Sequence, residues 1–414
     1  MQNPGSDEIE ESRPAVGKTG QEQDHNILPK AGLDREQVSI FNAIRCRFPN
    51  TNEVPELSSP GVRKKVLGAI AHCTQAHWKR PAGLRVVVAT GAYGLAAASA
   101  GREWEVETWR GWAIPLWGDG PYRSEIWTPS GSEIPVLTTY HTARLFREPD
   151  LRPVLLMDWS KVARILRGSW PNKLPSLRRI PLLHWPLYFS FDTEFDPLGH
   201  LTRYSMADKE LNVTVVEAME HIQPSIELGL TTVTMQNAPA DIGHFLDLTG
   251  VGYHVAKHDL RIDDIMLMHS VLWPGWPHSL EFLGSLYSRL NRWKHLSRTN
   301  PIIYSGADAY GTMEVDLRMR QEFKPDPQSW KVYDEYVRPH VWTIERATRE
   351  GMRTSLQNVT RFQGVLEKQR DEAVLMAQAA VGWPINLGSP GAKGQVGHWI
   401  YDIMGIKPRN RRTR

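Results

Sequence analysis

Two acidic residues lie one position apart at the end of an apolar segment, FSFDTEFD (189–196). In a β-strand, residues i and i+2 point to the same face, so Asp192 and Glu194 are expected to project together. Two like charges held side by side are costly unless a cation or a proton offsets them. The pair is therefore a candidate metal site, and further acidic residues are needed to complete it.

Two later acidic residues have the spacing to do so. Asp241 lies in NAPAD, four residues after Asn237. Asp308 lies in YSGAD, four residues after Tyr304, at the start of a helical pattern. Because residues i and i+4 share one face of a helix, Tyr304 and Asp308 can point into one pocket.

Four such carboxylates could hold two divalent cations about 3.5–4 Å apart. Hard cations such as Mg²⁺ or Mn²⁺ take this all-oxygen ligation. One ion would generate hydroxide from water and the other would stabilise a leaving 3′ oxygen, while a tyrosine hydroxyl would orient the attacking water. The predicted metal ligands are Asp192, Glu194, Asp241 and Asp308, and the catalytic set adds Tyr304.

The order D-x-E, N-x3-D, Y-x3-D resembles that of the DEDD-type 3′–5′ exonucleases with tyrosine in the third motif. The resemblance covers about 187–323, includes the connecting piece DDIMLMHSVLWPGWPHSLEFLGSLY, and is closest to the proofreading domain of family A DNA polymerases. It implies an RNase H-like fold, with a mixed sheet flanked by helices. It also implies a metal-dependent exonuclease that acts on DNA 3′ ends.

Two alternative assignments remain in this segment. His254 and His258 form H-x3-H, which on a helix could bind zinc. The segment is short and β-branched, and no third ligand has suitable spacing, so we favour structural or surface histidines. Asp263 or Asp264 could replace Asp241 as the third ligand. In the family pattern that position ends a strand, so we keep Asp241 and hold Asp264 as the alternative.

Composition sets broad limits. The 414 residues suffice for two or three domains, and 41% hydrophobic and 23% charged residues are typical of a soluble globular protein. No run of 18 apolar residues occurs, so no membrane span is expected. The polar N-terminus has no signal-peptide core, and two cysteines fit a reducing compartment, so we expect a cytoplasmic location in a bacterium or phage-infected cell. The net charge of +3 says little about nucleic acid.

The sequence pattern predicts an α/β protein in four parts. A first α/β unit carries apolar strands at 85–91 and 134–140 and an amphipathic helix at 150–168. A proline-rich basic linker separates it from the exonuclease-like unit, and helical patterns follow at about 329–351 and 356–381. The predicted boundaries are 1–169, 170–186, 187–323 and 324–414.

Several motifs of the first unit resemble the uracil-DNA glycosylase superfamily, in its iron–sulfur, family 4-like branch. QNPG (2–5) lies where the family has its water-activating loop, and SRPAVGKTGQ (12–21) resembles a family segment that follows it. AGLDREQVSIFNAIRC (31–46) resembles a helix and strand of the family, and TTYHTARLFREPDLRP (138–153) resembles its oxyanion loop. The resemblance implies a three-layer αβα unit and a base-flipping chemistry. The implied pocket residues are Asn3, Asn42 as the uracil reader, His141 as the oxyanion stabiliser and Leu145 as the wedge.

The glycosylase-like unit departs from the family pattern. Ala15 replaces the phenylalanine that stacks on the flipped base, and Thr142 replaces a loop proline. A [4Fe–4S] cluster needs four thiolates, whereas Cys46 and Cys73 are the only cysteines, so no cluster is expected. The other two ligands and the first strand would lie upstream of Met1. We therefore expect a degenerate pocket.

The C-terminal part resembles the first helices of a family A polymerase domain. The segments that carry this resemblance are VWTIERATREGMRTSLQNVTRFQGVLEKQ, INLGSP and HWIYDIMGIKPRNRRTR. The palm aspartates and the fingers lysine would lie beyond Arg414, so nucleotide addition is not expected from this polypeptide. Because both ends look cut, we expect a split product, a mis-called gene or a fragment.

Glycosylase, exonuclease and start of polymerase occur in the order of some replicative polymerases of large bacterial viruses. The leading prediction is a 3′–5′ exonuclease that acts on single-stranded DNA ends. The alternatives are a uracil-DNA glycosylase and a non-catalytic DNA-binding subunit that docks on a separate polymerase polypeptide. A binding subunit has no need of four aligned acids. Basic residues in 170–186 and 407–414 could contact phosphates, although solvated basic loops are more common.

Overall fold

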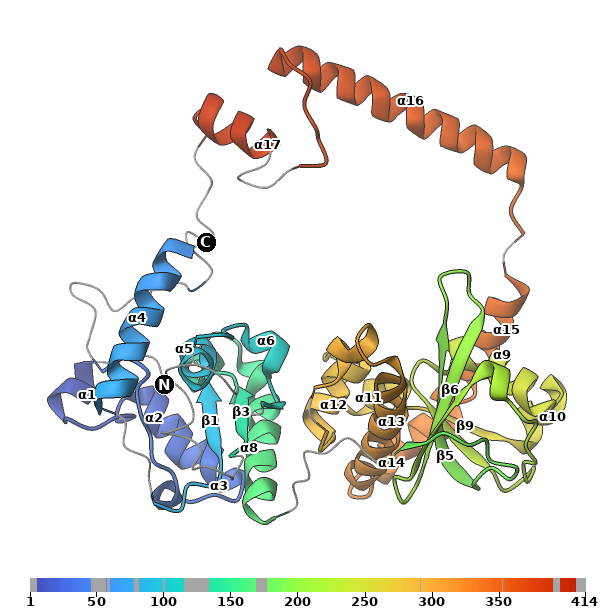
Figure 1. The fold of residues 1–414 in the computed structure, drawn as a ribbon, viewed down its shortest axis with the longest axis horizontal. Helices are drawn as coiled ribbons and strands as arrows, with labels where there is room; N and C mark the ends of the chain where they lie inside the picture. The colour runs from blue at the N-terminus through green and yellow to red at the C-terminus, as the bar shows by residue number, and fades with distance from the viewer. Residues whose placement is uncertain are drawn as a thin grey trace. The chain divides into compact units, whose positions relative to one another are not determined.

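The structure is a computed structural model, which describes residues 6–45, 57, 60–77, 82–99, 101–114, 134–168, 177–290, 292–351, 353–389 and 395–406. It divides into two compact units, Met1–Thr348 and Arg349–Arg414. The described residues of the first unit form two β-sheets, one in its glycosylase-like part and one in its exonuclease-like part (Figure 1). The mixed α/β class is thus confirmed, and the three boundaries between the four predicted parts stay predictions.

The sheet of the glycosylase-like part has the strand order β1-β3-β2. Strands β1 (Val87–Thr90) and β3 (Val136–Thr139) are parallel, and β2 (Ala113–Ile114) is antiparallel to β3. The two predicted strands and the predicted helix, α8 (Arg152–Leu166), are present. The other helices are α1 (Ser6–Glu10), α2 (Lys18–Glu22), η1 (Gln23–Ile27), α3 (Leu28–Lys30), η2 (Arg35–Gln37), α4 (Pro60–His77), α5 (Gly91–Ala98), α6 (Val106–Trp109), η3 (Thr142–Phe146) and η4 (Pro149–Leu151).

Packing of α8 on β3 forms the core of this part. Apolar residues of α8, including Leu155 and Trp159, are buried with Leu137 of β3 and Ile27 of η1. The spacing of four residues places Leu155 and Trp159 on one face of the helix. The apolar face of the amphipathic helix predicted from the sequence therefore packs against the sheet.

The exonuclease-like part is built on a six-stranded sheet of order β4-β7-β6-β5-β8-β9. Its central strands β5, β6 and β7 are antiparallel neighbours, whereas β8 and β9 run parallel to β5. This is a mixed sheet, as the resemblance implied. The strands are β4 (Leu177–Arg178), β5 (Tyr188–Phe195), β6 (Leu201–Asp208), β7 (Val213–Glu217), β8 (Thr232–Met235) and β9 (Arg261–Asp264).

Helices cover both faces of this sheet (Figure 1). Buried residues of α11, α12 and α13 pack on one face, and those of α9, α10 and α15 pack on the other. The helical elements are η5 (Ala218–Glu220), α9 (Ala238–Thr249), α10 (Tyr253–Asp259), α11 (Ile265–Leu272), α12 (Leu280–Tyr287), η6 (Lys294–Ser297), α13 (Pro301–Phe323), α14 (Pro327–Lys331), η7 (Val332–Val337) and α15 (His340–Glu350).

Alternation along β5 sets which side chains face α13. Phe189 and Phe191 are fully buried in the cluster on the opposite face. Ser190 faces α13, because its hydroxyl donates to the carbonyl oxygen of Ala309 at 2.6 Å. Asp192 and Glu194 follow Ser190 at intervals of two residues, so they share its face.

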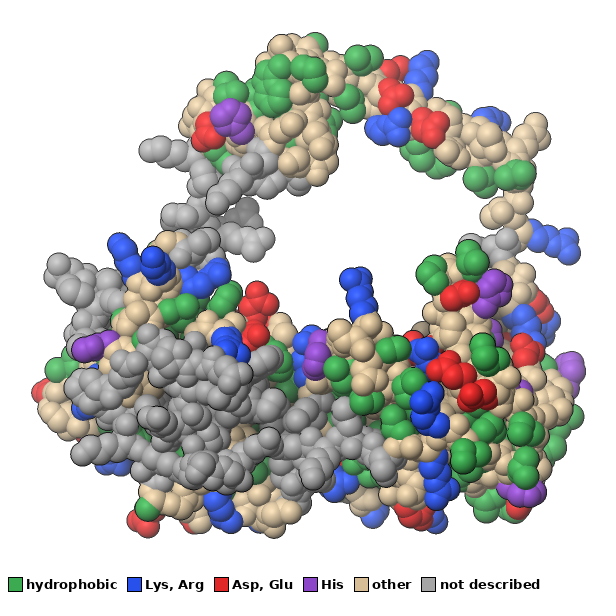
Figure 2. All heavy atoms as spheres, viewed as in Figure 1, with side chains coloured by type: hydrophobic (Ala, Val, Ile, Leu, Met, Phe, Trp, Pro, Cys, Tyr) green, Lys and Arg blue, Asp and Glu red, His purple; other side chains and the backbone are tan. Residues whose placement is uncertain are grey.

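The second unit is helical and contains α16 (Leu356–Val381), α17 (Gln395–Gly397) and η8 (His398–Ile403). The helix α16 matches the pattern predicted at 356–381; it begins after Ser355, whose hydroxyl accepts from the backbone N–H of Asn358. None of its side chains is buried, and Phe362, Leu375 and Met376 are among the exposed ones. Hydrophobic side chains accordingly appear on the surface of this helix (Figure 2). No helix in the described ranges is long and apolar enough to cross a membrane, and the cytoplasmic location stays a prediction.

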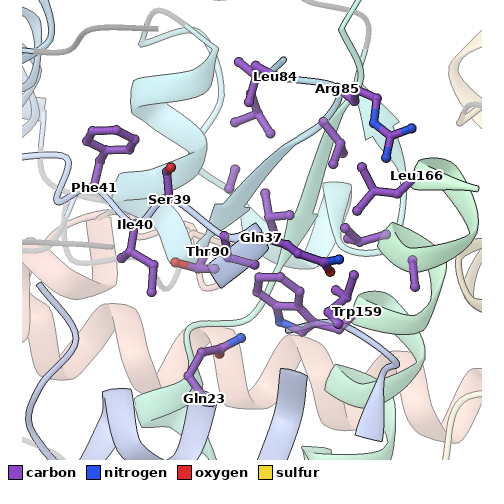
Figure 3. Close-up of a pocket in the computed structure, with 18 of the residues that line it drawn as sticks. Gln23, Gln37, Ser39, Ile40, Phe41, Leu84, Arg85, Thr90, Trp159 and Leu166 are labelled. Carbon is purple, nitrogen blue, oxygen red and sulfur yellow. The ribbon is translucent and has the colours of Figure 1, made fainter. Parts of the chain in front are cut away.

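One element prediction was wrong. Residues 31–46 were expected to form a helix and a strand, but the described part of this segment contains only the single turn η2 and no strand. A cavity of about 640 Å³ lies between residues 38–41 and β1 (Figure 3). A strand needs a hydrogen-bonded neighbour, whereas residues 38–41 line the cavity and β1 pairs with β3.

Candidate active site

Three carboxylates meet where β5 lies against α13. Asp192 and Glu194 come from β5, and Asp308 comes from the second turn of α13. One oxygen of each lies within 4.8 Å of the others. The structure thus brings together both residues of the D-x-E motif and the aspartate of the third motif.

Electrostatic repulsion is strong in this cluster. Burial, and then the charges of Asp308, Asp241 and Glu194, raise the pKa of Asp192 well above its ordinary value. Burial and Asp308 also raise the pKa of Glu194. The Oδ2 atom of Asp192 is buried and has no hydrogen-bond partner among the described residues. These acids, with an oxygen left unpaired, have the donor set that a hard divalent cation requires.

Asp308 is held by two donors that the sequence reasoning missed. The indole N–H of Trp293 and the ammonium group of Lys294 both contact its Oδ1, each at 2.6 Å. Burial alone would lower the pKa of Lys294, but the neighbouring Asp308 raises it to about 12, so the side chain is a fixed cation. Two donors on one oxygen fix the orientation of the carboxylate. The adjacent Trp-Lys pair just before the third-motif helix was the available signal.

Tyr304 lies one turn before Asp308 on α13, as predicted. Its hydroxyl accepts a hydrogen bond from Lys294 at 3.3 Å. Burial and then the charge of Asp308 raise the pKa of Tyr304 to about 12. The hydroxyl therefore keeps its proton at neutral pH and can donate it to a water or to a phosphate oxygen.

Asp241 lies near the cluster but outside the group of three. It occupies the first turn of α9, and its carboxylate accepts a hydrogen bond from the hydroxyl of Thr193. Burial raises the pKa of Asp241 to about 7, partly offset by Thr193. Its charge contributes to the raised pKa of Asp192. Its role as a metal ligand stays a prediction.

The carboxylate of the alternative third ligand, Asp264, is occupied by hydrogen bonds from backbone groups. Its carboxylate accepts from the backbone N–H groups of Asn237 at 3.2 Å, Ala238 at 2.9 Å and Met266 at 2.8 Å. It therefore caps the start of α9 and of α11. With its oxygens taken by backbone donors, Asp264 is a poorer ligand candidate than Asp241.

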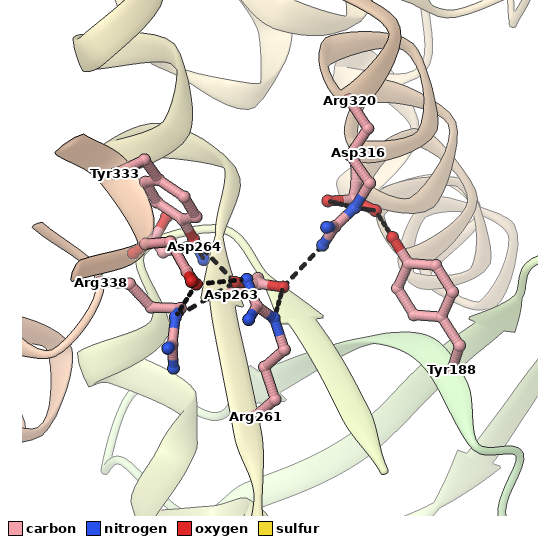
Figure 4. A network of polar contacts seen from close by, with 9 residues as sticks. Tyr188, Arg261, Asp263, Asp264, Asp316, Arg320, Tyr333 and Arg338 are labelled. Atoms are coloured by element: carbon pink, nitrogen blue, oxygen red, sulfur yellow. Dashed lines mark hydrogen bonds and ion pairs between the residues drawn. The ribbon is translucent and has the colours of Figure 1, made fainter. Parts of the chain in front are cut away.

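Asp263 belongs to a separate buried ion-pair network (Figure 4). Its side chain contacts the guanidinium groups of Arg261 at 2.9 Å and Arg320 at 2.6 Å, and the Tyr333 hydroxyl at 3.1 Å. Arg320 also pairs with the buried Asp316. These contacts join β9, α13 and η7, so the role of Asp263 is structural.

The two histidines of the H-x3-H motif lie on α10 with exposed side chains. Among the described residues, neither His254 nor His258 belongs to a group of three metal-ligating side chains. This agrees with surface histidines.

The glycosylase-like pocket residues are only partly described. Asn42 is buried, and its amide donates to Glu8 at 3.5 Å. The ring of His141 accepts from the backbone N–H of Ala143, and burial lowers the pKa of His141 to about 3, so the ring is neutral at pH 7. Gly91 has φ +70, and a Cβ there would lie 3.1 Å from the Cβ of His141, so the strand-to-helix turn approaches the histidine closely. Asn3 lies outside the described residues.

The wedge role stays a prediction that the position of Leu145 does not favour. Its side chain is 3% exposed and packs in the core with α8, whereas a wedge must be free to enter the base stack. The next residue, Phe146, is 56% exposed. Of the two cysteines, Cys73 is a buried free thiol whose sulfur accepts from the N–H of Arg45, and Cys46 lies outside the described residues.

Comparison with solved structures gives weak similarities. One is Brucella melitensis NrnC with bound Mg²⁺, which is 13% identical, covers 44% of this chain and 98% of that chain, and has a TM-score of 0.35. Another is the POL domain of Pol1 from M. smegmatis in complex with DNA primer-template and dNTP, which is 16% identical, covers 55% of this chain and 38% of that chain, and has a TM-score of 0.36. The EXD2 exonuclease domain soaked in Mn and Mg is 15% identical, covers 43% of this chain and 90% of that chain, and has a TM-score of 0.16. At these TM-scores the similarities carry no argument about activity.

Comparison by sequence concerns the N-terminal part. The type-4 uracil-DNA glycosylase of Sulfurisphaera tokodaii is 27% identical over 169 residues, 39% of this chain and 66% of that protein. That of Saccharolobus solfataricus is 28% identical over 169 residues, 40% of this chain and 69% of that protein. The chain thus spans about two thirds of these relatives. The Uracil DNA glycosylase superfamily model matches residues 2–162, so the N-terminal part carries a domain of that superfamily, as the resemblance predicted.

Proposed function

We propose that this chain is a metal-dependent 3′–5′ exonuclease acting on single-stranded DNA ends. The observation that supports this proposal most directly is the cluster of Asp192, Glu194 and Asp308. The protonated Tyr304 lies one helical turn before Asp308. An acidic cluster alone is common in proteins. Here the acids are partly or fully buried and repel one another, and they follow the motif order of the exonuclease resemblance.

The donor set fits Mg²⁺ or Mn²⁺. All three close ligand atoms are carboxylate oxygens, and the charge repulsion that raises the pKa of Asp192 would be relieved by a divalent cation. When bound, such cations supply Lewis acidity toward water and toward the leaving oxygen. Asp241 is proposed as a further ligand, because its charge already acts on Asp192.

The protein's own side chains position the reactants. The Tyr304 hydroxyl can donate to an oxygen of the attacked phosphate or hold the attacking water. Lys294 provides a fixed positive charge between Tyr304 and Asp308, and this charge can attract the phosphate group. Both side chains act without changing protonation at neutral pH.

Removal of divalent metal should abolish the activity. With 5′-labelled single-stranded DNA, the full-length protein is expected to give a ladder of products shortened from the 3′ end in Mg²⁺ or Mn²⁺, and intact DNA in EDTA. Denaturing gel electrophoresis measures both. Intact DNA in Mg²⁺ and in Mn²⁺ would overturn the proposal.

Replacement of Tyr304 by phenylalanine should lower kcat on the order of 10²-fold with little change in KM, because the hydroxyl acts on the reacting groups rather than on distant nucleotides. Single-turnover rates on the same DNA measure the effect. Tyr310→Phe is a matched control on the same helix, because its hydroxyl is 3.5 Å from Arg289, which pairs with Glu314 rather than with the three-carboxylate cluster. An equal loss in both variants would argue against a role for Tyr304 in the chemistry.

A second candidate activity is uracil excision, which is favoured by the superfamily match over residues 2–162. In the same assay, alkali-labile sites that form only at uracil and survive EDTA would support it. The absence of both activities would leave the non-catalytic DNA-binding subunit as the remaining hypothesis.

A further inference from the structure

A tryptophan of the glycosylase-like part contacts the tryptophan that binds Asp308. Trp112 lies just before β2, and its ring meets that of Trp293 edge to face, with centroids 5.3 Å apart and planes at 84°. Both side chains are almost fully buried, at 2% and 1% exposure. Trp293 in turn donates its indole N–H to Asp308. A chain of direct contacts therefore runs from the glycosylase-like part to a carboxylate of the exonuclease cluster.

The two rings fit into a space left by glycines. A Cβ atom at Gly284 would lie 2.8 Å from the ring of Trp112 and 2.9 Å from that of Trp293. A Cβ atom at Gly311 would lie 2.8 Å from Trp293. Two glycines on α12 and α13 thus permit the contact, and Trp293 has little room to reorient.

Buried polar contacts hold Trp112 in place. Arg110 pairs with Asp158 of α8 at 2.9 Å and also donates to the hydroxyl of Ser285 on α12. The ammonium group of Lys161 donates to the carbonyl oxygens of Gly111 at 2.7 Å and Ser285 at 3.1 Å. These contacts tie Arg110 and Gly111, the two residues that precede Trp112, to α12.

The backbone of Gly111 and Trp112 is also hydrogen-bonded to β3. The N–H of Gly111 donates to the carbonyl oxygen of Thr138 at 2.8 Å, and the N–H of Thr138 donates to that of Trp112 at 3.4 Å. Gly111 has φ +73, and a Cβ there would lie 2.5 Å from the carbonyl oxygen of Ser285. The segment is therefore built for close approach between the two parts.

We infer that Trp112 is a positioning residue for the exonuclease site: it holds Trp293, and through it the Asp308 carboxylate, in the orientation that binds the divalent cation. This rests on the proposed function for the identity of the reaction, but the metal-binding consequence can be measured without DNA. The glycosylase-like part would then support the exonuclease site whether or not it excises uracil.

The test measures Mn²⁺ binding to the full-length protein by isothermal titration calorimetry, together with the exonuclease rate. Trp293→Phe keeps a ring but removes the N–H donor, and should weaken Mn²⁺ binding about 10-fold or more, as outer-shell substitutions do. Trp112→Ala should weaken Mn²⁺ binding in the same direction and lower the rate at limiting Mn²⁺, with recovery at saturating Mn²⁺. Trp112→Phe, which restores an edge contact, should recover most of the affinity.

Trp159→Ala is the matched control. Trp159 is 4% exposed in the core of the same part and does not belong to the buried cluster that contains Trp112 and Trp293. It should lower thermal stability and leave the Mn²⁺ affinity unchanged. The inference is overturned if Trp112→Ala binds Mn²⁺ like the wild type, or if Trp159→Ala loses as much affinity.

The two claims can fail separately. A wild type that binds Mn²⁺ but leaves DNA intact refutes the proposed function, and the Mn²⁺ affinities of the variants still decide the role of Trp112. A wild type that binds no Mn²⁺ refutes both.

Discussion

Replacing Asp192 by asparagine should lower the rate of 3′-end degradation by about 10³-fold or more, because a metal ligand worth several kcal/mol of transition-state stabilisation is lost. Asp192 shares the cluster with Glu194 and Asp308, and its ionised form is opposed by burial and by these charges. Asparagine keeps the shape and removes one charge. The thermal stability in EDTA should therefore be unchanged or higher, while the stabilisation by Mn²⁺ should disappear. Nuclease rates and thermal melts with and without Mn²⁺ measure both effects.

Asp196→Asn is a suitable control for this variant. Asp196 follows the same strand and is also acidic, but its carboxylate contacts the backbone N–H groups of Leu198 and His200 in an exposed turn. Its loss should leave the nuclease rate near that of the wild type. A wild-type rate for Asp192→Asn would show that the cluster is not the active site.

Replacing Asp263 by alanine should reduce the free energy of unfolding by about 3–5 kcal/mol, the cost of leaving partly buried cations without their partner. Asp263 is fully buried and contacts Arg261, Arg320 and the Tyr333 hydroxyl (Figure 4). The arginine side chains are 23–29% exposed, and partial solvation places the expected value at the lower end. Urea denaturation followed by tryptophan fluorescence measures the change.

Asp334 offers the comparison within the same network. Its side chain is 30% exposed and pairs with Arg261 at 2.8 Å and Arg338 at 2.9 Å. Because water screens exposed ion pairs, Asp334→Ala should cost about 1 kcal/mol or less. If Asp263→Ala lowers the free energy of unfolding by no more than Asp334→Ala, the burial of Asp263 adds nothing to stability, and the predicted difference is contradicted.

The local rules of chain geometry predicted the core of the candidate site. The interval of two residues between Asp192 and Glu194 places both on the face of β5 that meets α13. The interval of four residues places Tyr304 and Asp308 on one face of α13. Each inference needs only the periodicity of a single element, so one sequence was sufficient. The mixed sheet was predicted from the family resemblance rather than from periodicity.

Contacts between distant segments could not be predicted in this way. Thr193 lies on the opposite face of β5 from its two acidic neighbours, and its bond to Asp241 depends on how α9 packs. Trp293 and Lys294 reach Asp308 only because α12 and α13 bring the intervening turn back to the site. Leu145 was assigned from its position in a loop motif, although its apolar side chain had a core to enter.

The contact between Trp112 and Trp293 also bears on how the chain folds during synthesis. Trp112 leaves the ribosome about 180 residues before its partner, an interval of roughly 10–35 s at 5–20 residues per second. Until α12 and α13 arrive, Trp112 and Val154 lack most of the buried cluster that surrounds them in the finished protein. The nascent glycosylase-like part thus presents an apolar surface that is a target for chaperones or for aggregation. The exonuclease-like part is synthesised later and completes its core against Trp112 and Val154 of the glycosylase-like part.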